Sequence, residues 1–168
     1  RDGCRYMSEK INLTWEDIKQ DCKTLADSLS KENITCIIGI ANGGMIPATL
    51  LAKHLKVDKL LSANLKSYVD DKPRDGVHSE TDVVRLITFP DFGTLRDEEK
   101  ILVVDDLADT GMTLRKVKQI DSIVTWERPE QNKWVYSTLY YKPKSTFTPN
   151  YTVRDFDNDQ WIVFPWES

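Results

Sequence analysis

Two adjacent carboxylates, Asp105 and Asp106, follow a run of four aliphatic residues and precede a short loop of small and polar residues. The aliphatic run at 101–104 predicts a buried parallel strand. In open α/β sheets, ligands bind just beyond the carboxyl ends of strands, and the N–H groups that open the next helix suit a phosphate. Carboxylates accept hydrogen bonds from sugar hydroxyls. The segment therefore predicts a sugar-phosphate site, with loop amides around the phosphate.

Residues 101–114 closely resemble the signature by which type I phosphoribosyltransferases bind 5-phosphoribosyl diphosphate (PRPP). That signature has four hydrophobic residues, two acids and a loop ending in Asp-Thr-Gly-x-Thr, and this chain matches nearly all of it. The resemblance implies that Asp105 and Asp106 bind the ribose hydroxyls of PRPP and help to position Mg²⁺, which is held chiefly by substrate and water oxygens. It implies a 5-phosphate loop made of Ala108, Asp109, Thr110, Gly111, Met112 and Thr113.

Asp109 has a separate role in the purine-using branch of this family. There, an acid at the matching place lies near N7 of the base and can move its proton, which general acid–base chemistry requires. The resemblance therefore implies that Asp109 is catalytic. The alternative is that Asp109 is a loop carboxylate that caps the following helix.

A second loop falls where the family binds pyrophosphate, and it consists of Ala41, Asn42, Gly43 and Gly44. The family usually has Arg or Lys before the two glycines, often at a cis non-proline bond. Here the residue is Asn42, whose amide can donate a hydrogen bond but brings no positive charge. The chain therefore departs from the family pattern at the place where a polyanion would bind.

A polar stretch at 69–81 predicts a mobile loop. Lys72 and Arg74 in this stretch would supply positive charge if the loop closes over the site as a lid. Their alternative role is that of solvated loop charges. Ser67 and Tyr68, which precede the stretch, match a family Ser-Tyr pair that lies near the reacting centre.

The C-terminal segment resembles that of bacterial xanthine-guanine phosphoribosyltransferases and related archaeal purine enzymes. The resemblance implies that Lys142 donates to O6 of a purine, that Trp161 stacks on the ring, and that the backbone at Ile162 reads the C2 side. Stacking on a base is worth about 1–3 kcal/mol and tolerates different bases. An ammonium facing O6 would favour 6-oxopurines over adenine, whose amine is a donor. Phe164 and Trp166 are expected to be structural aromatics.

Alternating strands and helices predict a mostly parallel, twisted α/β sheet flanked by helices, with a small C-terminal hood region. Helical periodicity covers 15–31, after Thr14 as N-cap with Asp17 as an acidic capping-box partner, and further helices are expected at 47–55 and from 114. Strands are expected at 36–40, 60–67, 83–89, 101–104 and 134–141, with short irregular strands over the sheet at 142–168. Residues 1–6 are expected to be an extension, and 7–168 a single domain.

The chain has 168 residues, of which 40% are apolar and 30% charged, an ordinary composition for one soluble domain. Apolar stretches stay below the roughly 20 residues that span a bilayer. The net charge of −4 offers no basic face for nucleic acid. Cys4, Cys22 and Cys36 lack metal-ligand spacing and are expected to be free thiols in a reducing cytoplasm. We therefore expect neither nucleic acid nor membrane as a partner.

Together, these features predict a Mg²⁺-dependent purine phosphoribosyltransferase that joins guanine, xanthine or hypoxanthine to PRPP, giving a nucleoside 5′-monophosphate and pyrophosphate. Family members usually pair, so a homodimer or homotetramer is expected. Two alternatives stay open. A phosphoribosyltransferase with a non-purine acceptor would make Lys142 and Trp161 incidental. A PRPP- or nucleotide-binding regulatory protein with weak or lost catalysis is favoured by Asn42.

Overall fold

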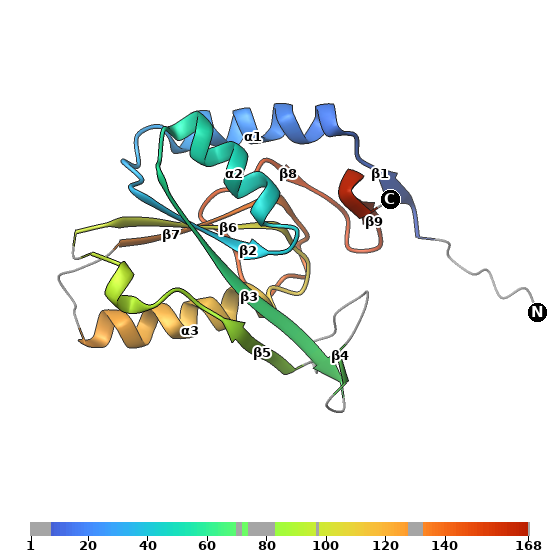
Figure 1. The fold of residues 1–168 in the computed structure, drawn as a ribbon. Helices are drawn as coiled ribbons and strands as arrows, with labels where there is room; N and C mark the ends of the chain where they lie inside the picture. Colours follow the sequence, from blue (N-terminus) through green and yellow to red (C-terminus); the bar gives the residue numbers. More distant parts are fainter. Residues whose placement is uncertain (1–7, 70–71, 74–82, 97, 128–132, 168) are drawn as a thin grey trace, which may run out of the picture.

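A central twisted sheet with helices on both faces forms the body of the molecule (Figure 1). The computed structural model describes residues 8–69, 72–73, 83–96, 98–127 and 133–167. The sheet runs in the order β4-β3-β2-β6-β7-β8, and β5 also pairs with β3. Its strands are β2 (Cys36–Ala41), β3 (Lys59–Val69), β4 (Lys72–Pro73), β5 (Val83–Thr88), β6 (Lys100–Ala108), β7 (Lys133–Tyr141) and β8 (Arg154–Asp155).

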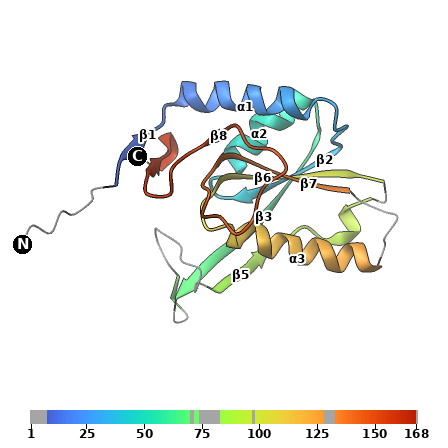
Figure 2. The ribbon, with the colours of Figure 1, turned by 180° about the vertical axis from the view of Figure 1, so that it is seen from behind.

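The helices α1 (Trp15–Leu29) and α2 (Met45–Leu55) cover one face of the sheet, and α3 (Met112–Glu127) covers the other, as both ribbon views show (Figures 1 and 2). Each face has its own apolar core: Leu25 and Leu51 pack on the first, and Leu114 and Val117 on the second. The predicted α/β architecture is therefore confirmed. None of the helices in the described part of the chain is long and apolar enough to cross a membrane.

The central strands explain why the sequence of β6 is aliphatic until Asp105. Residues 101–104 are fully buried between the two helical layers, so both sides of the strand must be apolar. β2 and β6 are parallel, with Gly39 beside Val104, and β6 and β7 are parallel, with Asp105 beside Thr138. The carboxyl ends of these strands therefore meet at one edge of the sheet, where Asp105 emerges from the core.

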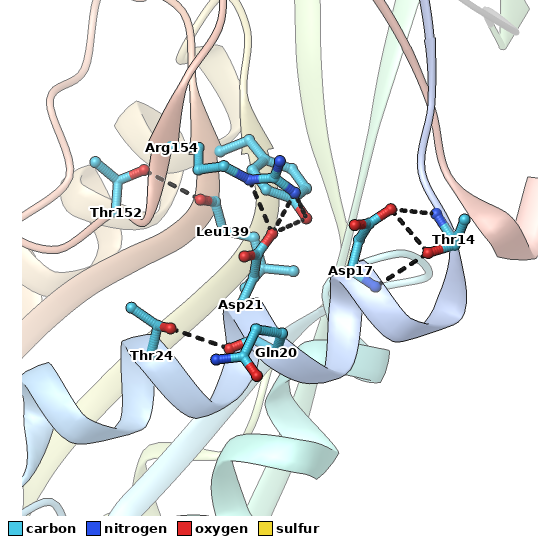
Figure 3. A network of polar contacts seen from close by, with 9 residues as sticks. Thr14, Asp17, Gln20, Asp21, Thr24, Leu139, Thr152 and Arg154 are labelled. Carbon is cyan, nitrogen blue, oxygen red and sulfur yellow. Dashed lines mark hydrogen bonds and ion pairs between the residues drawn. The ribbon is translucent and has the colours of Figure 1, made fainter.

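A polar network joins α1 to β7 and β8, the last two strands of the sheet (Figure 3). At the start of α1, Thr14 and Asp17 form the predicted capping box, which is confirmed. One turn later, Asp21 Oδ2 accepts hydrogen bonds from the Tyr140 hydroxyl at 2.6 Å and from Arg154 Nη2 at 2.5 Å. Because Tyr140 lies on β7 and Arg154 on β8, this carboxylate links three elements and fixes how α1 sits on the sheet.

The C-terminal hood differs from the expectation of short strands over the main sheet. β8 joins that sheet through β7, and Tyr151 adds an isolated bridge to Ser137 of β7. β9 (Trp161–Val163) pairs in parallel with β1 (Lys10–Asn12), which the sequence analysis missed, and the two form a separate small sheet. A 3₁₀ turn, η2 (Pro165–Glu167), follows β9, and another, η1 (Phe92–Thr94), follows β5. Three-residue strands are too short for a periodic pattern, so their pairing was not visible in the sequence.

Candidate active site

A cavity of about 310 Å³ opens at the carboxyl edge of β2 and β6, under the hood. It brings together the acidic pair, the glycine loop after β2, part of the loop before α3, and the hood. Its lining residues are Ile40, Ala41, Asn42, Gly43, Leu65, Asp105, Asp106, Leu107, Asp109, Thr113, Lys142, Trp161, Ile162, Phe164 and Glu167. Segments more than a hundred residues apart in the chain thus share one site.

The acidic pair is oriented by its own backbone. Asp105 Oδ1 accepts a hydrogen bond from the Asp106 N–H at 2.9 Å, and Asp106 Oδ1 accepts one from the Leu107 N–H at 2.8 Å. Burial raises the pKa of Asp105 well above its usual range, and the neighbouring charge of Asp106 raises it further. Burial also raises the pKa of Asp106, and the Glu167 carboxylate adds to this rise. The pair is therefore stabilised as two anions only when a cation or hydroxyl donors reach it.

The donor set at this pair suits Mg²⁺. Carboxylate oxygens are hard ligands of the kind that this ion prefers. Within the described residues, no group of three or more His, Cys, Asp or Glu side chains could hold a metal ion by itself. The residues therefore fit an ion that is shared with substrate and water oxygens, rather than one enclosed by protein ligands.

The glycine loop after β2 packs directly against the acidic pair. A Cβ on Gly43 would lie 2.2 Å from Asp106 Oδ2, and one on Gly44 would lie 2.7 Å from the carbonyl oxygen of Val104. Gly44 is also the N-cap of α2, which begins at Met45, two residues before the expected start. The peptide bond between Ala41 and Asn42 is cis. Gly44 is thus needed because backbone atoms approach too closely for any side chain, whereas a side chain at Gly43 would require the Asp106 carboxylate to move.

The loop before α3 is built against a second segment, residues 142–147, that the sequence analysis did not connect with it. The Lys142 N–H donates to the Ala108 carbonyl at 3.0 Å, and the Thr146 N–H and hydroxyl both donate to the Thr110 carbonyl at 2.8 Å. Gly111 has a φ of 80°, and a Cβ there would lie 2.5 Å from Ser145 Oγ. This segment therefore fixes the conformation of the loop.

Asp109 faces two lysines across this junction. Its Oδ1 atom lies 3.5 Å from Lys142 Nζ and 2.9 Å from Lys144 Nζ, although neither ammonium has the geometry of a hydrogen bond. In the first turn of α3, the Met112 N–H donates to the Thr110 hydroxyl oxygen at 3.4 Å, so a hydroxyl caps this N–H. The sequence analysis named Asp109 and Lys142 but missed Lys144, because their proximity depends on how the two loops pack.

The hood closes the cavity with aromatic and aliphatic groups. The Trp161 side chain is 43% exposed, whereas Ile162 and Lys142 are buried. Phe164 is also buried and stacks on Trp166 with ring centroids 4.6 Å apart, which supports the structural role expected of both. Glu167 lines the cavity and was missed, because a carboxylate near the end of a chain carries no sequence signal of its own.

Some predicted residues lie elsewhere or outside the described part. Ala108, Thr110, Gly111 and Met112 shape the loop but do not line the cavity, whereas Asp109 and Thr113 do. Ser67 and Tyr68 lie on β3, and Lys72 lies on β4, where the description covers the backbone alone. Arg74 and residues 1–6 fall outside the described residues, as does most of the expected mobile loop. The lid prediction therefore stays a prediction.

Comparisons with known proteins show the family to which the chain belongs. The family described as "Phosphoribosyl transferase domain" matches residues 12–168. The chain belongs to this phosphoribosyltransferase family. It is 31% identical to a xanthine-guanine phosphoribosyltransferase of Gluconobacter oxydans, over 93% of this chain and 83% of the relative. A crystal structure of a purine phosphoribosyltransferase from Pyrococcus horikoshii superimposes with a TM-score of 0.69 at 29% identity, covering 95% of both chains.

A further structural neighbour supports the fold alone. The Helicobacter pylori xanthine-guanine-hypoxanthine phosphoribosyltransferase has a TM-score of 0.76 at 20% identity, over 95% of this chain and 94% of the other. The family resemblance predicted from the loop at 105–113 is thus confirmed along nearly the whole chain.

Proposed function

We propose that this phosphoribosyltransferase transfers the 5-phosphoribosyl group of PRPP to a 6-oxopurine, which is guanine, xanthine or hypoxanthine. In the reaction, the bond from ribose C1 to the pyrophosphate oxygen breaks, and a bond from C1 to a purine nitrogen forms. The observation that carries the proposal is the shared cavity, in which buried Lys142 and half-exposed Trp161 lie with the acidic pair. The relatives named for xanthine and guanine support the same acceptor class.

The PRPP half of the site is assigned to the edge of the sheet. Asp105 and Asp106 would accept hydrogen bonds from the ribose hydroxyls, and the amides and hydroxyls of residues 108–113 would hold the 5-phosphate. The loop of Ala41, Asn42, Gly43 and Gly44 would face the pyrophosphate. Mg²⁺, when bound near the acidic pair, supplies positive charge to the pyrophosphate oxygens. Ser67, Tyr68, Lys72 and Arg74 are assigned to a closing loop.

The base half of the site is assigned to the hood. The Lys142 ammonium would donate to O6, the Trp161 ring would stack on the purine, and the backbone at Ile162 would meet its C2 side. Asp109 would accept the proton of N7 as the bond to ribose forms. Since an ammonium has three donors and no acceptor, adenine with its 6-amino group would be disfavoured.

The proposed function is tested by pyrophosphate release from PRPP and Mg²⁺ with guanine, xanthine, hypoxanthine, adenine, uracil and orotate in turn. We expect turnover only with the three 6-oxopurines. Turnover confined to a pyrimidine would contradict the assignment of Lys142 and Trp161. PRPP binding without turnover on any base would favour the regulatory alternative, for which Asn42 is the supporting feature.

Asn42 gives a further prediction about pyrophosphate binding. Asn42→Arg would restore a cation at a position that lines the cavity, so the KM for PRPP should fall about threefold to tenfold, with little change in the KM for the base. Steady-state kinetics in both substrates measure this. Asn42→Gln is the matched control, because it lengthens the side chain without adding charge. An unchanged KM in Asn42→Arg would show that the charge is not needed.

We also propose a cytoplasmic location and a homodimer or homotetramer. Cys22 and Cys36 are free and buried, in keeping with a reducing compartment. Trp15 at the start of α1 is 52% exposed, and as a large apolar residue on the surface it is a candidate for the assembly contact. Light scattering on the purified protein would give the mass of the assembly.

A further inference from the structure

We propose that Lys144 is a positioning residue for base recognition. In this role, Lys144 neutralises Asp109 and so leaves the Lys142 ammonium free to donate to O6 of the purine. The inference rests on the proposed function, since it concerns how the base half of that same site works. It assigns a role to a residue that the family signature does not include.

The geometry places both ammonium groups on one carboxylate oxygen. Lys144 Nζ is the nearer, at 2.9 Å from Asp109 Oδ1, and Lys142 Nζ lies at 3.5 Å from the same atom. The Lys142 side chain is 7% exposed, that of Asp109 is 21% exposed and that of Lys144 is 35% exposed. Both described ion pairs are made to Oδ1 of Asp109, and in the proposed role Oδ2 faces the base.

The backbone holds Lys144 in place opposite Asp109. The Lys144 N–H donates to Asn158 Oδ1 at 2.8 Å, and the Ser145 N–H closes a turn on the Lys142 carbonyl at 2.9 Å. Thr146 then bonds twice to the Thr110 carbonyl, one residue after Asp109. The segment that carries Lys144 is therefore hydrogen-bonded to the loop that carries Asp109. The backbone holds the two residues close together, which it does not do for an ordinary pair of exposed, flexible side chains.

The chemistry requires a second cation at this place. A neutral O6 acceptor competes poorly for an ammonium against a carboxylate, because the carboxylate carries a full negative charge and O6 does not. If Lys142 were the only cation at Asp109, it would stay on the carboxylate and O6 would lose its donor. With Lys144 on Oδ1, Lys142 can turn to the base without leaving an uncompensated, partly buried charge.

The test compares ligands that differ by the base alone. Isothermal titration calorimetry would give the Kd of guanosine 5′-monophosphate and of ribose 5-phosphate for the wild type, Lys144→Gln and Lys144→Arg. For Lys144→Gln we expect the Kd of the nucleotide to rise about threefold to fivefold, the effect of one partly exposed charge contact. The Kd of ribose 5-phosphate should stay within about twofold, and Lys144→Arg should restore nucleotide binding.

Kinetics provide the second measurement. Lys144→Gln should raise the KM for guanine and leave the KM for PRPP nearly unchanged. Lys19→Gln is the matched control, because Lys19 makes an exposed 4.0 Å ion pair with Glu16 on α1 and does not line the described cavity. Its constants should equal those of the wild type.

The possible outcomes separate the inference from the proposed function. Unchanged nucleotide binding in Lys144→Gln would overturn the inference, and so would equal weakening of nucleotide and ribose 5-phosphate, which indicates a merely structural role. A wild type that binds the nucleotide no more tightly than ribose 5-phosphate would overturn both. A wild type that binds the nucleotide selectively yet turns over no base contradicts the proposed function alone, while the calorimetric comparison still decides the role of Lys144.

Discussion

Asp109→Asn is expected to lower kcat by about 10²-fold to 10⁴-fold, the range over which a positioned general acid or base acts. The amide has nearly the same size but cannot accept the N7 proton of the purine. Asp109 lines the cavity beside Lys142, within reach of a base held there. The Kd of PRPP should change much less than kcat, because the amides of the 5-phosphate loop remain. Single-turnover kinetics and calorimetry with PRPP measure the two quantities separately.

Asp58→Asn is the matched control for this substitution. Asp58 is an exposed carboxylate just before β3, at the amino ends of the parallel strands, whereas the site lies at their carboxyl ends. Its loss should therefore leave kcat unchanged. If Asp109→Asn instead abolished PRPP binding while turnover per bound complex survived, Asp109 would be a PRPP ligand or a loop support. The assignment of Asp109 as the proton acceptor would then be wrong.

The sequence was informative where one continuous segment carries both fold and chemistry. Residues 101–104 are apolar because β6 is buried on both faces, and the acidic pair follows where the strand leaves the core. The family, the α/β architecture and the capping box at Thr14 could be predicted for this reason. Each depends on residues that are neighbours in the chain.

The contacts between distant segments could not be predicted in the same way. Lys144 meets Asp109 only because residues 142–147 bond to the loop at 108–111. The pairing of β1 with β9 joins opposite ends of the chain through three residues each. Asp21 contacts Tyr140 and Arg154 through tertiary packing, and these partners lie 119 and 133 positions away from it in the sequence. Such contacts leave no local spacing or periodicity to recognise.

Gly44→Ala is expected to destabilise the protein by about 1–3 kcal/mol, as overpacking of a tight site does, and to lower kcat/KM for PRPP at least tenfold. An added Cβ would lie 2.6 Å from the Ile40 carbonyl oxygen, 2.7 Å from that of Val104 and 3.0 Å from Asp105 Cα. All three are backbone atoms at the ends of central strands, so they cannot turn aside. The loop would have to move away from the acidic pair that it packs against.

The backbone conformation of Gly44 makes close contact the main reason for the expected loss. Its φ of −69° and ψ of −17° are right-handed helical values, which alanine adopts without strain. Without the contact, the substitution would cost at most about 1 kcal/mol, the preference of an N-cap for glycine over alanine. Urea denaturation and steady-state kinetics measure the two effects.

Gly93→Ala is the matched control for this contact. There the nearest atom to an added Cβ is the side-chain oxygen Asp91 Oδ1 at 3.3 Å, so we expect a change within about 0.5 kcal/mol and unchanged kinetics. A Gly44→Ala protein with the stability and activity of the wild type would show that the loop moves at little cost. The close approach of the glycine loop to the acidic pair would then not be a requirement of the site.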